Sequence, residues 1–397
     1  MKNYEDNIFN YILIALTCLN IFLKGSIVLV VFCLYNFFFV KQKINGTALL
    51  LFFLAFSVTA RILLDQNDIF NELVKASNYV LPYMIGFNGY TKANNKSLYI
   101  KRTLVSVFIG YNLHVLLMFV YNLIKGSSGR TMISIWTNEP VAVTLIGLLS
   151  SFIVGYALSI IIFDSGKWTK IVCVGTLILV IAVNMQTATR TPFILMLVTG
   201  AVLFIITQTE DGFKNQIKYL MIFSFIIFLI VIVFALNIFN VRDIFLSSDI
   251  IDRFSEEGME TGRWTANRFY ISKMLDYPFG GGEIQRLAGG RYAHNIWLQC
   301  YDEYGAIPFV FMVIITVSFI KIFIKIARMN DKTITEYILL SIYFTTLLQL
   351  ALEPVMTGYP ILFWIQLLIH GMATQHYKDV SIESKKIKKV SKYRRIV

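Results

Sequence analysis

Residues 139–163 read EPVAVTLIGLLSSFIVGYALSIIIF, and this stretch decides the fold class because Glu139 is its only charged residue. A helix needs about 20 mostly apolar residues to span a bilayer, so this run predicts a transmembrane helix. The rest of the chain has a similar composition: its 397 residues are 56% hydrophobic and 15% charged, with a mean hydropathy of +0.65. An ordinary soluble domain is about 25% charged. We therefore expect an all-α polytopic membrane protein.

Apolar runs of this kind recur along the whole chain. About 12 transmembrane helices are predicted, over residues 8–23, 26–40, 47–62, 76–90, 103–124, 139–163, 168–186, 191–207, 216–237, 297–320, 335–352 and 358–374. Lys and Arg are enriched in the cytoplasmic segments of membrane proteins. With the N-terminus inside, the cytoplasmic segments hold 23 Lys and Arg residues and the short outer segments hold six. The sequence thus predicts a multi-pass protein of the cytoplasmic membrane with both termini in the cytoplasm.

The expected domain organisation is one membrane domain over residues 1–377 and a basic cytoplasmic tail over 378–397. The one long hydrophilic element is an outer loop, 238–296, between the ninth and tenth predicted helices. The basic tail suits contact with anionic lipid. It has no interleaved aromatic residues for stacking on bases, so we expect no nucleic-acid partner. The four cysteines form no CxxC motif and indicate neither a zinc site nor disulfides.

The outer loop contains a predicted helix over residues 263–276. At helical spacing, Trp264, Arg268, Ile271 and Leu275 fall on one side. A second side carries Arg263, Asn267 and Tyr270. Such a helix on the membrane surface presents Arg263 to a lipid headgroup. The alternative is that Arg263 pairs with a nearby acid, namely Glu256, Glu257 or Glu260.

Glycines mark two bends in the same loop, GGG at 280–282 and GG at 289–290. We interpret them as turns, because no Gly-Lys-Ser/Thr follows to make a P-loop. The alternative is that Gly281 lets backbone amides approach a phosphate.

Arg190 lies in the short connection between the seventh and eighth predicted helices, at the outer surface. Ionisable groups at this depth are costly, and they are usually paired or functional. The alternative is an arginine whose head reaches the membrane interface while its stem stays in the apolar region.

His294 and Asn295 precede the tenth predicted helix. Asn295 is placed to cap that helix with its side chain. His294 then sits at a helix N-terminus, where the positive end of the helix dipole favours the neutral imidazole, which can accept a proton. The alternative is a histidine that merely lies at the interface. Asp302 and Glu303 lie deeper; Glu303 is on the far side of the helix from His294, and we expect each acid to pair with an arginine.

Arginines and a histidine at one end of a helical bundle suit a particular chemistry. Arginine binds phosphate and diphosphate through bidentate hydrogen bonds. A histidine can deprotonate a hydroxyl. Together they fit the attack of a hydroxyl on a carbon that bears a diphosphate leaving group. The sequence shows no carboxylate-rich metal cluster, so arginine would take the charge-neutralising role and no cofactor is expected.

Several of these features, in this order, resemble the O-antigen polymerase and O-antigen ligase superfamily. The matching segments are Thr189-Arg190-Thr191, Gly262-Arg263-Trp264, YPFGGG at 277–282, and HNIWL…EYG at 294–305. The resemblance covers roughly residues 187–305; elsewhere it is limited to the number and order of helices. Two family features are absent: Thr-Pro-Phe-Ile follows Arg190 where small residues are usual, and the Arg-x10-Gly pattern of some polymerases is missing.

This resemblance implies a GT-C-like, metal-independent membrane glycosyltransferase. It would polymerise polyprenyl-diphosphate-linked oligosaccharide repeat units of a capsule, O-antigen or exopolysaccharide on the outer face of the membrane. His294 would activate or position the acceptor hydroxyl, with Asn295, Glu303 and Gly281 in support. Arg190 and a loop arginine would bind the donor diphosphate, and the choice among Arg263, Arg268 and Arg291 stays open. A flippase and a chain-length regulator are the protein partners to expect.

Three alternatives remain at this point. An O-antigen-type ligase shares the chemistry but transfers the lipid-linked glycan to a final acceptor. A lipid-linked oligosaccharide flippase or transporter also commonly has twelve helices, although matching halves are not evident here. The best candidate for a transporter's charged residue is Glu353, but its surroundings, EPVMTGYP, predict an outer turn. A non-catalytic assembly partner is the third alternative.

Overall fold

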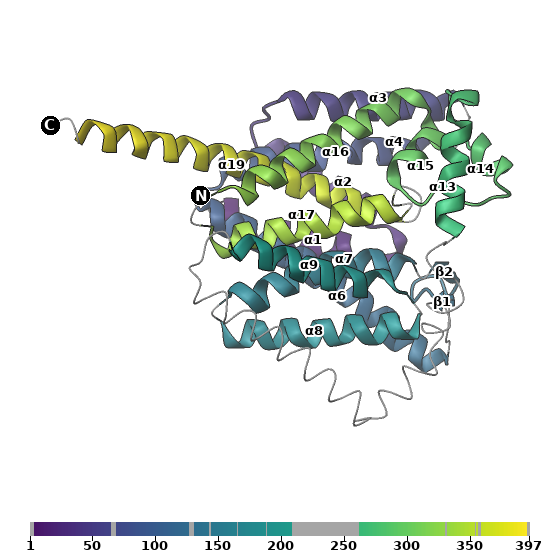
Figure 1. The fold of residues 1–397 in the computed structure, drawn as a ribbon, viewed down its shortest axis with the longest axis horizontal. Helices are drawn as coiled ribbons and strands as arrows, with labels where there is room; N and C mark the ends of the chain where they lie inside the picture. The colour runs from purple at the N-terminus through teal and green to yellow at the C-terminus, as the bar shows by residue number, and fades with distance from the viewer. Residues whose placement is uncertain are drawn as a thin grey trace.

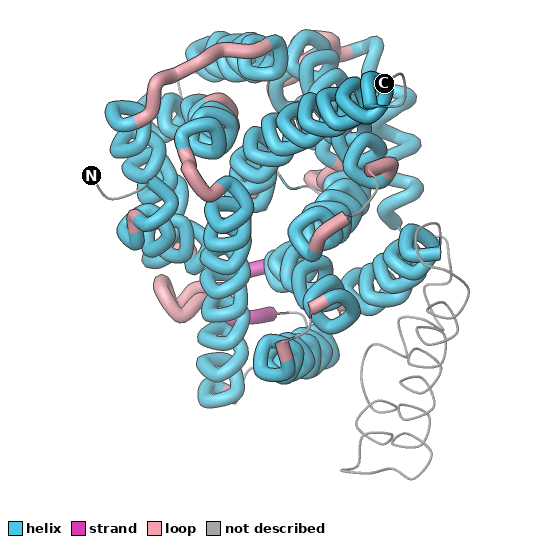
Figure 2. The backbone as a smooth tube through the Cα atoms, turned by 90° about the vertical axis from the view of Figure 1, so that its left-hand side faces the viewer, coloured by secondary structure: helices cyan, strands magenta, loops and turns pink. Residues whose placement is uncertain are grey.

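The computed structural model describes residues 4–64, 69–126, 131–142, 144–164, 166–187, 189–208, 262–329, 332–353, 355 and 359–394. Its long helices run side by side as a bundle (Figure 1). These are α1 (Ile8–Leu19), α2 (Gly25–Phe39), α3 (Gly46–Leu64), α4 (Ile69–Asn78), α5 (Leu81–Lys92), α6 (Lys96–Lys125), α7 (Thr144–Phe163), α8 (Lys167–Gln186), α9 (Thr191–Gln208), α16 (Ala306–Ala327), α17 (Ile334–Leu352) and α19 (Pro360–Arg394). Figure 2 shows many of them end-on.

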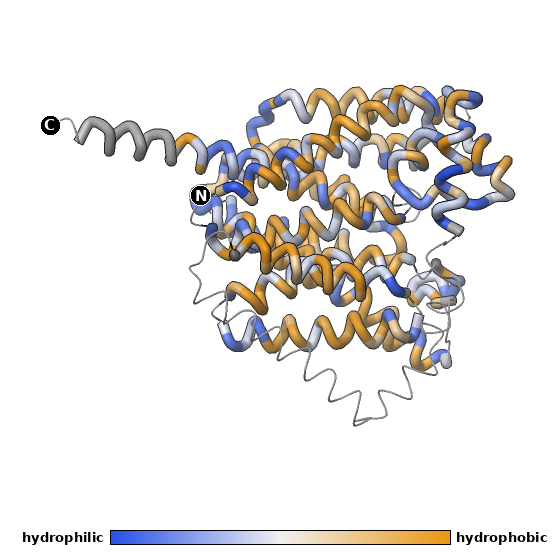
Figure 3. Tube along the Cα trace, in the orientation of Figure 1, coloured by the Kyte–Doolittle hydropathy of each residue, from blue (hydrophilic) through white to orange (hydrophobic). Residues whose placement is uncertain are grey.

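The chain is a predominantly α-helical membrane protein. Within the described residues, six helices are long and apolar enough to cross a membrane: α3, α6, α7, α8, α16 and α17. Three shorter apolar helices accompany them, at Ile8–Leu19, Gly25–Phe39 and Thr191–Ile206. Hydrophobic residues fill the middle of the bundle and hydrophilic ones gather towards its two ends (Figure 3). The count of twelve spans and the orientation of the termini stay predictions, and the expected span 216–237 lies outside the described residues.

The two ends of the bundle differ. At one end, which we call the terminal end, lie the N-terminus and the start of α6, and from it α19 extends outward (Figure 1). At the other, which we call the α13 end, short elements pack across the helix ends. These are the strands β1 (Thr131–Ile133) and β2 (Pro140–Ala142), and the helices α13 (Gly262–Lys273), α14 (Glu283–Leu287) and α15 (Ile296–Tyr304). The strands form an antiparallel hairpin in which Met132 pairs with Val141.

Helices α5 and α19 pack closely against each other in the core. A Cβ atom on Gly86 would collide with the backbone of Leu368, and one on Gly371 would collide with the backbone of Tyr83. Small residues let helix backbones approach in this way in membrane proteins. Trp364 of α19 and Tyr83 of α5 are fully buried beside this contact.

Two predicted boundaries are wrong. The expected span 297–320 is two helices, α15 and α16, separated by Gly305 with φ +92°. Of these two helices, only α16 has the length and composition of a span. Helix α15 therefore lies outside the membrane-spanning helices, and so does the loop that carries His294 and Asn295 directly before it. The expected fourth span, 76–90, corresponds to α5, preceded by the separate helix α4. Helix α19 continues without a break from its apolar part through the basic segment to Arg394.

Candidate functional site

Helix α13 carries three polar side chains on one side, and all three contact the rest of the protein. Arg263 reaches the end of α17, where it forms an ion pair with Glu353. Asn267 accepts a hydrogen bond from the backbone N–H of His294 at 2.9 Å. The Tyr270 hydroxyl donates to the carbonyl of Arg291 at 2.8 Å. The predicted helix and its polar side are thus confirmed, and this side fastens α13 to the bundle and to the loop before α15.

Glu353 is the partner of Arg263. Nη2 of Arg263 lies 2.9 Å from Oε1 of Glu353, and the two side chains are 34% and 3% exposed. Nη1 also donates to the Leu352 carbonyl at 3.3 Å. Glu353 Oε2 is buried without a hydrogen-bond partner in the described chain. The acids considered from sequence, Glu256, Glu257 and Glu260, lie outside the described residues.

Burial and the guanidinium act in opposite directions on Glu353. Burial raises the pKa of its carboxyl, and the charge and hydrogen bond of Arg263 lower it. The net pKa stays above the ordinary value because the desolvation of a buried carboxylate outweighs one partly exposed guanidinium.

His294 is half-buried in the loop that leads into α15. Burial first, and the positive charge of Arg263 second, lower its pKa to about 4. The imidazole is therefore neutral near pH 7, as predicted, and burial is the larger of these two causes. Its Nδ1 atom is buried and has no hydrogen-bond partner among the described residues. A neutral imidazole with an unused ring nitrogen can accept a proton.

Two asparagines hold His294 in place. Asn267 fixes its backbone N–H from α13. Asn295 caps α15, as predicted, because its side-chain oxygen accepts from the Leu298 N–H at 2.8 Å. We refer to Arg263, Asn267, His294 and Glu353 together as the Arg263 cluster.

The triple glycine at 280–282 forms a turn, as expected, and all three residues have positive φ. Its amides are already used: Gly281 N–H donates to the Glu303 carbonyl at 3.1 Å, and Gly282 N–H to the Asp302 carbonyl at 2.8 Å. The Gly281 amide therefore fastens the turn to α15 and is not turned to a phosphate. Gly281 also lies against the guanidinium of Arg61 from α3.

Among the residues that the structure describes, the acids of α15 form no ion pair with an arginine. Asp302 accepts from the backbone N–H groups of Ile284 at 2.9 Å and Gln285 at 3.4 Å, so it caps α14. Glu303 accepts from the Gln299 side chain at 3.0 Å. Burial raises the pKa of Glu303 to about 7.

Arg190 lies in the α8–α9 connection at the α13 end. Its carbonyl accepts from the N–H groups of Phe193 and Ile194 at 3.2 and 3.4 Å, which starts α9. The neighbouring Thr189 packs against Gly147 near the start of α7, just after the β hairpin. The guanidinium is half-buried. Arg190 thus shares the α13 end with the Arg263 cluster but comes from a different pair of helices.

The other two candidate arginines, Arg268 and Arg291, are exposed. The Arg268 guanidinium is exposed over the Trp264 ring, 5.5 Å from its centroid. Arg291 is exposed, and its backbone carbonyl is the group that contacts α13. Trp264 and Ile271 on the outer side of α13 are exposed as well, so this side is apolar apart from Arg268.

Sequence reasoning did not assign Glu353 or Asn267 to the site. The available signal for Glu353 was an acid followed by proline directly after an apolar helix, at the predicted outer end of that helix. For Asn267 the signal was its position one turn after Arg263 on the same side of a predicted helix.

In the described residues, no three His, Cys, Asp or Glu side chains form a group that could hold a metal ion. No protein-family model matches the sequence, and no curated protein matches it significantly. The interpretation of the Arg263 cluster therefore depends on its own geometry.

Proposed function

We propose that this chain is a GT-C-like membrane glycosyltransferase that polymerises polyprenyl-diphosphate-linked oligosaccharide repeat units. The reaction takes place at the α13 end, on the outer face of the cytoplasmic membrane, and both termini are cytoplasmic. The observation that carries this proposal is the neutral, half-buried His294 imidazole beside an arginine anchored on a buried carboxylate. This pairing of a base with a cation suits a hydroxyl nucleophile and an anionic leaving group.

The proposed step is a single displacement. The acceptor hydroxyl oxygen forms a bond to the anomeric carbon of the donor sugar, while the bond from that carbon to the diphosphate oxygen breaks. The hydroxyl proton passes to the neutral imidazole of His294, and the polyprenyl diphosphate leaves with the bonding electron pair. One displacement of this kind inverts the anomeric configuration.

Arg263 can serve the donor diphosphate while it stays paired with Glu353. A guanidinium has five N–H donors in a planar fork. Glu353 accepts one N–H of Nη2, and the Leu352 carbonyl accepts one N–H of Nη1. A third of the Arg263 side chain remains exposed. Glu353 thus orients the guanidinium, and the remaining donors are available to phosphate oxygens. Arg190, at the same end of the bundle, supplies a second cation.

Donor binding also changes the basicity of His294 in the useful direction. The charge of Arg263 is one of the two causes that lower the His294 pKa. A diphosphate bound to Arg263 cancels much of that charge, so the imidazole becomes a stronger base when the donor is in place.

A glycan-ladder gel tests the proposal on cells that lack this chain and are complemented with wild type or variants. We expect single repeats at the surface without the chain and a ladder with it. His294→Ala and Arg263→Gln should each reduce the ladder at least tenfold at equal protein level, because each removes a group acting in the transition state. Lys273→Gln is the matched control: it removes one charge from the same helix, where Lys273 pairs only with Asp276 at 3.0 Å.

The same gel separates the alternatives. Full-length polymer that stays on its lipid carrier would indicate a ligase. Repeats trapped inside the cell, with none at the surface, would indicate a flippase. A ladder that survives both His294→Ala and Arg263→Gln but disappears on deletion would indicate a non-catalytic assembly partner.

A further inference from the structure

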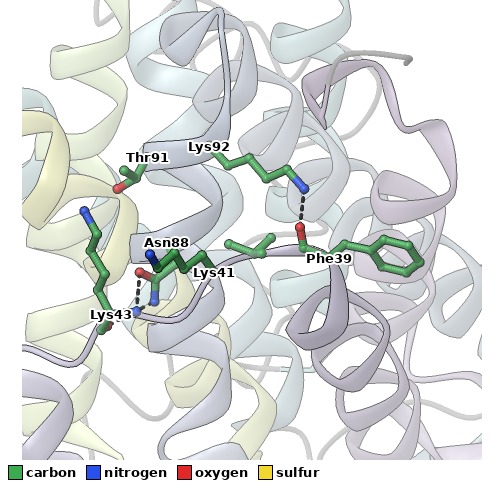
Figure 4. Close-up of a pocket in the computed structure, with 7 residues that line it drawn as sticks. Phe39, Lys41, Lys43, Asn88, Thr91 and Lys92 are labelled. Carbon is green, nitrogen blue, oxygen red and sulfur yellow. Dashed lines mark hydrogen bonds between the residues drawn. The ribbon is translucent and has the colours of Figure 1, made fainter.

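A second candidate site lies at the terminal end of the bundle, opposite the Arg263 cluster. It is a pocket of about 410 Å³ between the α2–α3 connection and the end of α5. Figure 4 shows the side chains that line it, which are Phe39, Val40, Lys41, Lys43, Asn88, Thr91 and Lys92. Three of these seven residues carry an ammonium group, and none of them is acidic.

The backbone that carries Lys41 and Lys43 is held in place by a buried side chain. Asn88 is 2% exposed, and its Oδ1 accepts from the Lys43 N–H at 3.0 Å. Its Nδ2 donates to the Lys43 carbonyl and to the Gln42 side chain, both at 3.2 Å. The connection is therefore ordered by specific hydrogen bonds, and the pocket is a built feature of the fold.

Within the residues that the structure describes, no acidic side chain forms an ion pair with the lysines of this pocket. Lys92 donates to the Phe39 carbonyl at the end of α2 and lies 5.5 Å from the centroid of the Tyr4 ring, and neither of these partners is an anion. Lys41 and Lys43 are exposed and make no ion pair within the described chain. Ammonium groups gathered around one concave surface attract an anion, and lysine is a common phosphate ligand.

The neighbourhood of the pocket suits a lipid. Phe38 is 81% exposed and Ile44 is 72% exposed, on either side of the lysine-bearing connection. Apolar side chains of this kind lie in the acyl region of a bilayer, while lysines beside them reach the headgroups. Anionic headgroups attract basic residues near the membrane surface.

We propose that this pocket binds a phosphate group, presented by the headgroup of an anionic phospholipid. This site is independent of the proposed glycosyl transfer, because it lies at the opposite end of the bundle from the Arg263 cluster. Lys41 and Lys43 contact the phosphate oxygens, and Phe38 and Ile44 lie against the acyl chains.

Native mass spectrometry of the purified full-length chain tests this proposal. The chain is titrated separately with phosphatidylglycerol, with phosphatidylcholine and with inorganic phosphate. We expect phosphatidylglycerol to be retained in preference to phosphatidylcholine, and Lys41→Gln/Lys43→Gln to weaken this retention about tenfold. Lys41→Arg/Lys43→Arg should retain the lipid, since it keeps both charges. Lys167→Gln/Lys170→Gln, at the start of α8 on the same end, is the matched control and should bind as wild type does.

Each outcome is decisive. Binding of inorganic phosphate that disappears in Lys41→Gln/Lys43→Gln, without preference between the lipids, would support phosphate recognition and assign a soluble source. An equal loss of phosphatidylglycerol in the α8 control would overturn the proposal, because general surface charge would then explain the binding. Unchanged retention in Lys41→Gln/Lys43→Gln would overturn it as well.

Discussion

Arg263 in the first turn of α13 and Glu353 at the end of α17 form an ion pair with an N–O distance of 2.9 Å. This contact joins the layer across the α13 end to a helix of the bundle. Glu353 is almost fully buried while Arg263 is one-third exposed. Because the Glu353 carboxylate is the more deeply buried group, it depends on Arg263 to compensate its charge more than Arg263 depends on Glu353.

We predict that single and double variants of this pair separate its structural role from its chemical one. Arg263→Gln leaves a buried carboxylate without its cation and should lower the free energy of unfolding by about 2 kcal/mol. Arg263→Gln/Glu353→Gln removes both charges and should recover most of that loss. The ladder should stay absent in the double variant, since the donor-binding cation is still missing. Thermal unfolding in detergent and the glycan-ladder gel provide the two readouts. A double variant that regains both stability and ladder would contradict the proposed role of Arg263.

Local patterns were sufficient to predict several parts of this site. The spacing of Arg263, Asn267 and Tyr270 places them on one side of a helix whatever lies around it. Asn295 caps α15 because capping depends on the residue and the helix start alone. The partner of Arg263 was not predictable in this way, because Glu353 is far along the chain and tertiary packing brings the two together.

The boundary at Gly305 was missed for a different physical reason. Hydropathy along 297–320 stays high on both sides of this glycine, so an average over the run predicts one helix. The break depends on the backbone, since Gly305 adopts φ +92° and its neighbour Ala306 donates to the Pro278 carbonyl at 2.9 Å. That contact comes from the glycine-rich turn, which sequence analysis treated separately from the helix.

The pH dependence of His294 reactivity is a second prediction. Its pKa is lowered to about 4, so diethyl pyrocarbonate should modify it at a nearly constant rate from pH 7 to pH 5, and the rate should halve near pH 4. The modification rate of an ordinary histidine halves near pH 6.5. Peptide mass spectrometry reads out His294 separately from the buried His114, His370 and His376. Arg263→Gln should move the midpoint upward, because it removes one of the two causes of the shift. A wild-type midpoint near 6.5 would rule out the neutral, desolvated imidazole.

Glu303 supports a third prediction, in which the pKa is raised by burial, whereas the pKa of His294 is lowered. Its pKa is raised to about 7, so the folded chain binds a proton more tightly than the unfolded chain between pH 4.5 and pH 7. Its stabilising contribution is complete below pH 4.5 and is lost as the pH rises through 7. Glu303→Gln mimics the protonated form, so it should match wild type in thermal unfolding at pH 4 and exceed it by about 1–3 kcal/mol at pH 8. A difference that does not change with pH would contradict this.

A comparison of two glycines tests how the triple-glycine turn is fastened to α15. Gly280 and Gly289 have similar φ values, +74° and +68°, so alanine at either position meets a comparable backbone strain of about 1 kcal/mol. A Cβ atom on Gly280 would also lie 2.5 Å from the Gly305 nitrogen and 2.8 Å from the Tyr304 carbonyl carbon, whereas one on Gly289 meets open space. We expect Gly280→Ala to lower the melting temperature several degrees more than Gly289→Ala and to weaken the ladder. Equal effects would mean that the close approach to α15 contributes nothing.

Asn267 is a positioning residue in this scheme, and two substitutions separate the effect of its hydrogen bond from the effect of a charge placed at this position. Its side-chain oxygen accepts from the His294 N–H at 2.9 Å. Asn267→Ala loses this acceptor, so the ladder should weaken about threefold to tenfold as the imidazole loses its fixed position, while the pH midpoint of His294 modification stays near 4. Asn267→Asp keeps the acceptor and adds a negative charge beside His294, so the midpoint should rise and the ladder should be largely retained. If both substitutions weaken the ladder equally and leave the midpoint unchanged, Asn267 contributes only to the stability of α13 and not to the placement of His294.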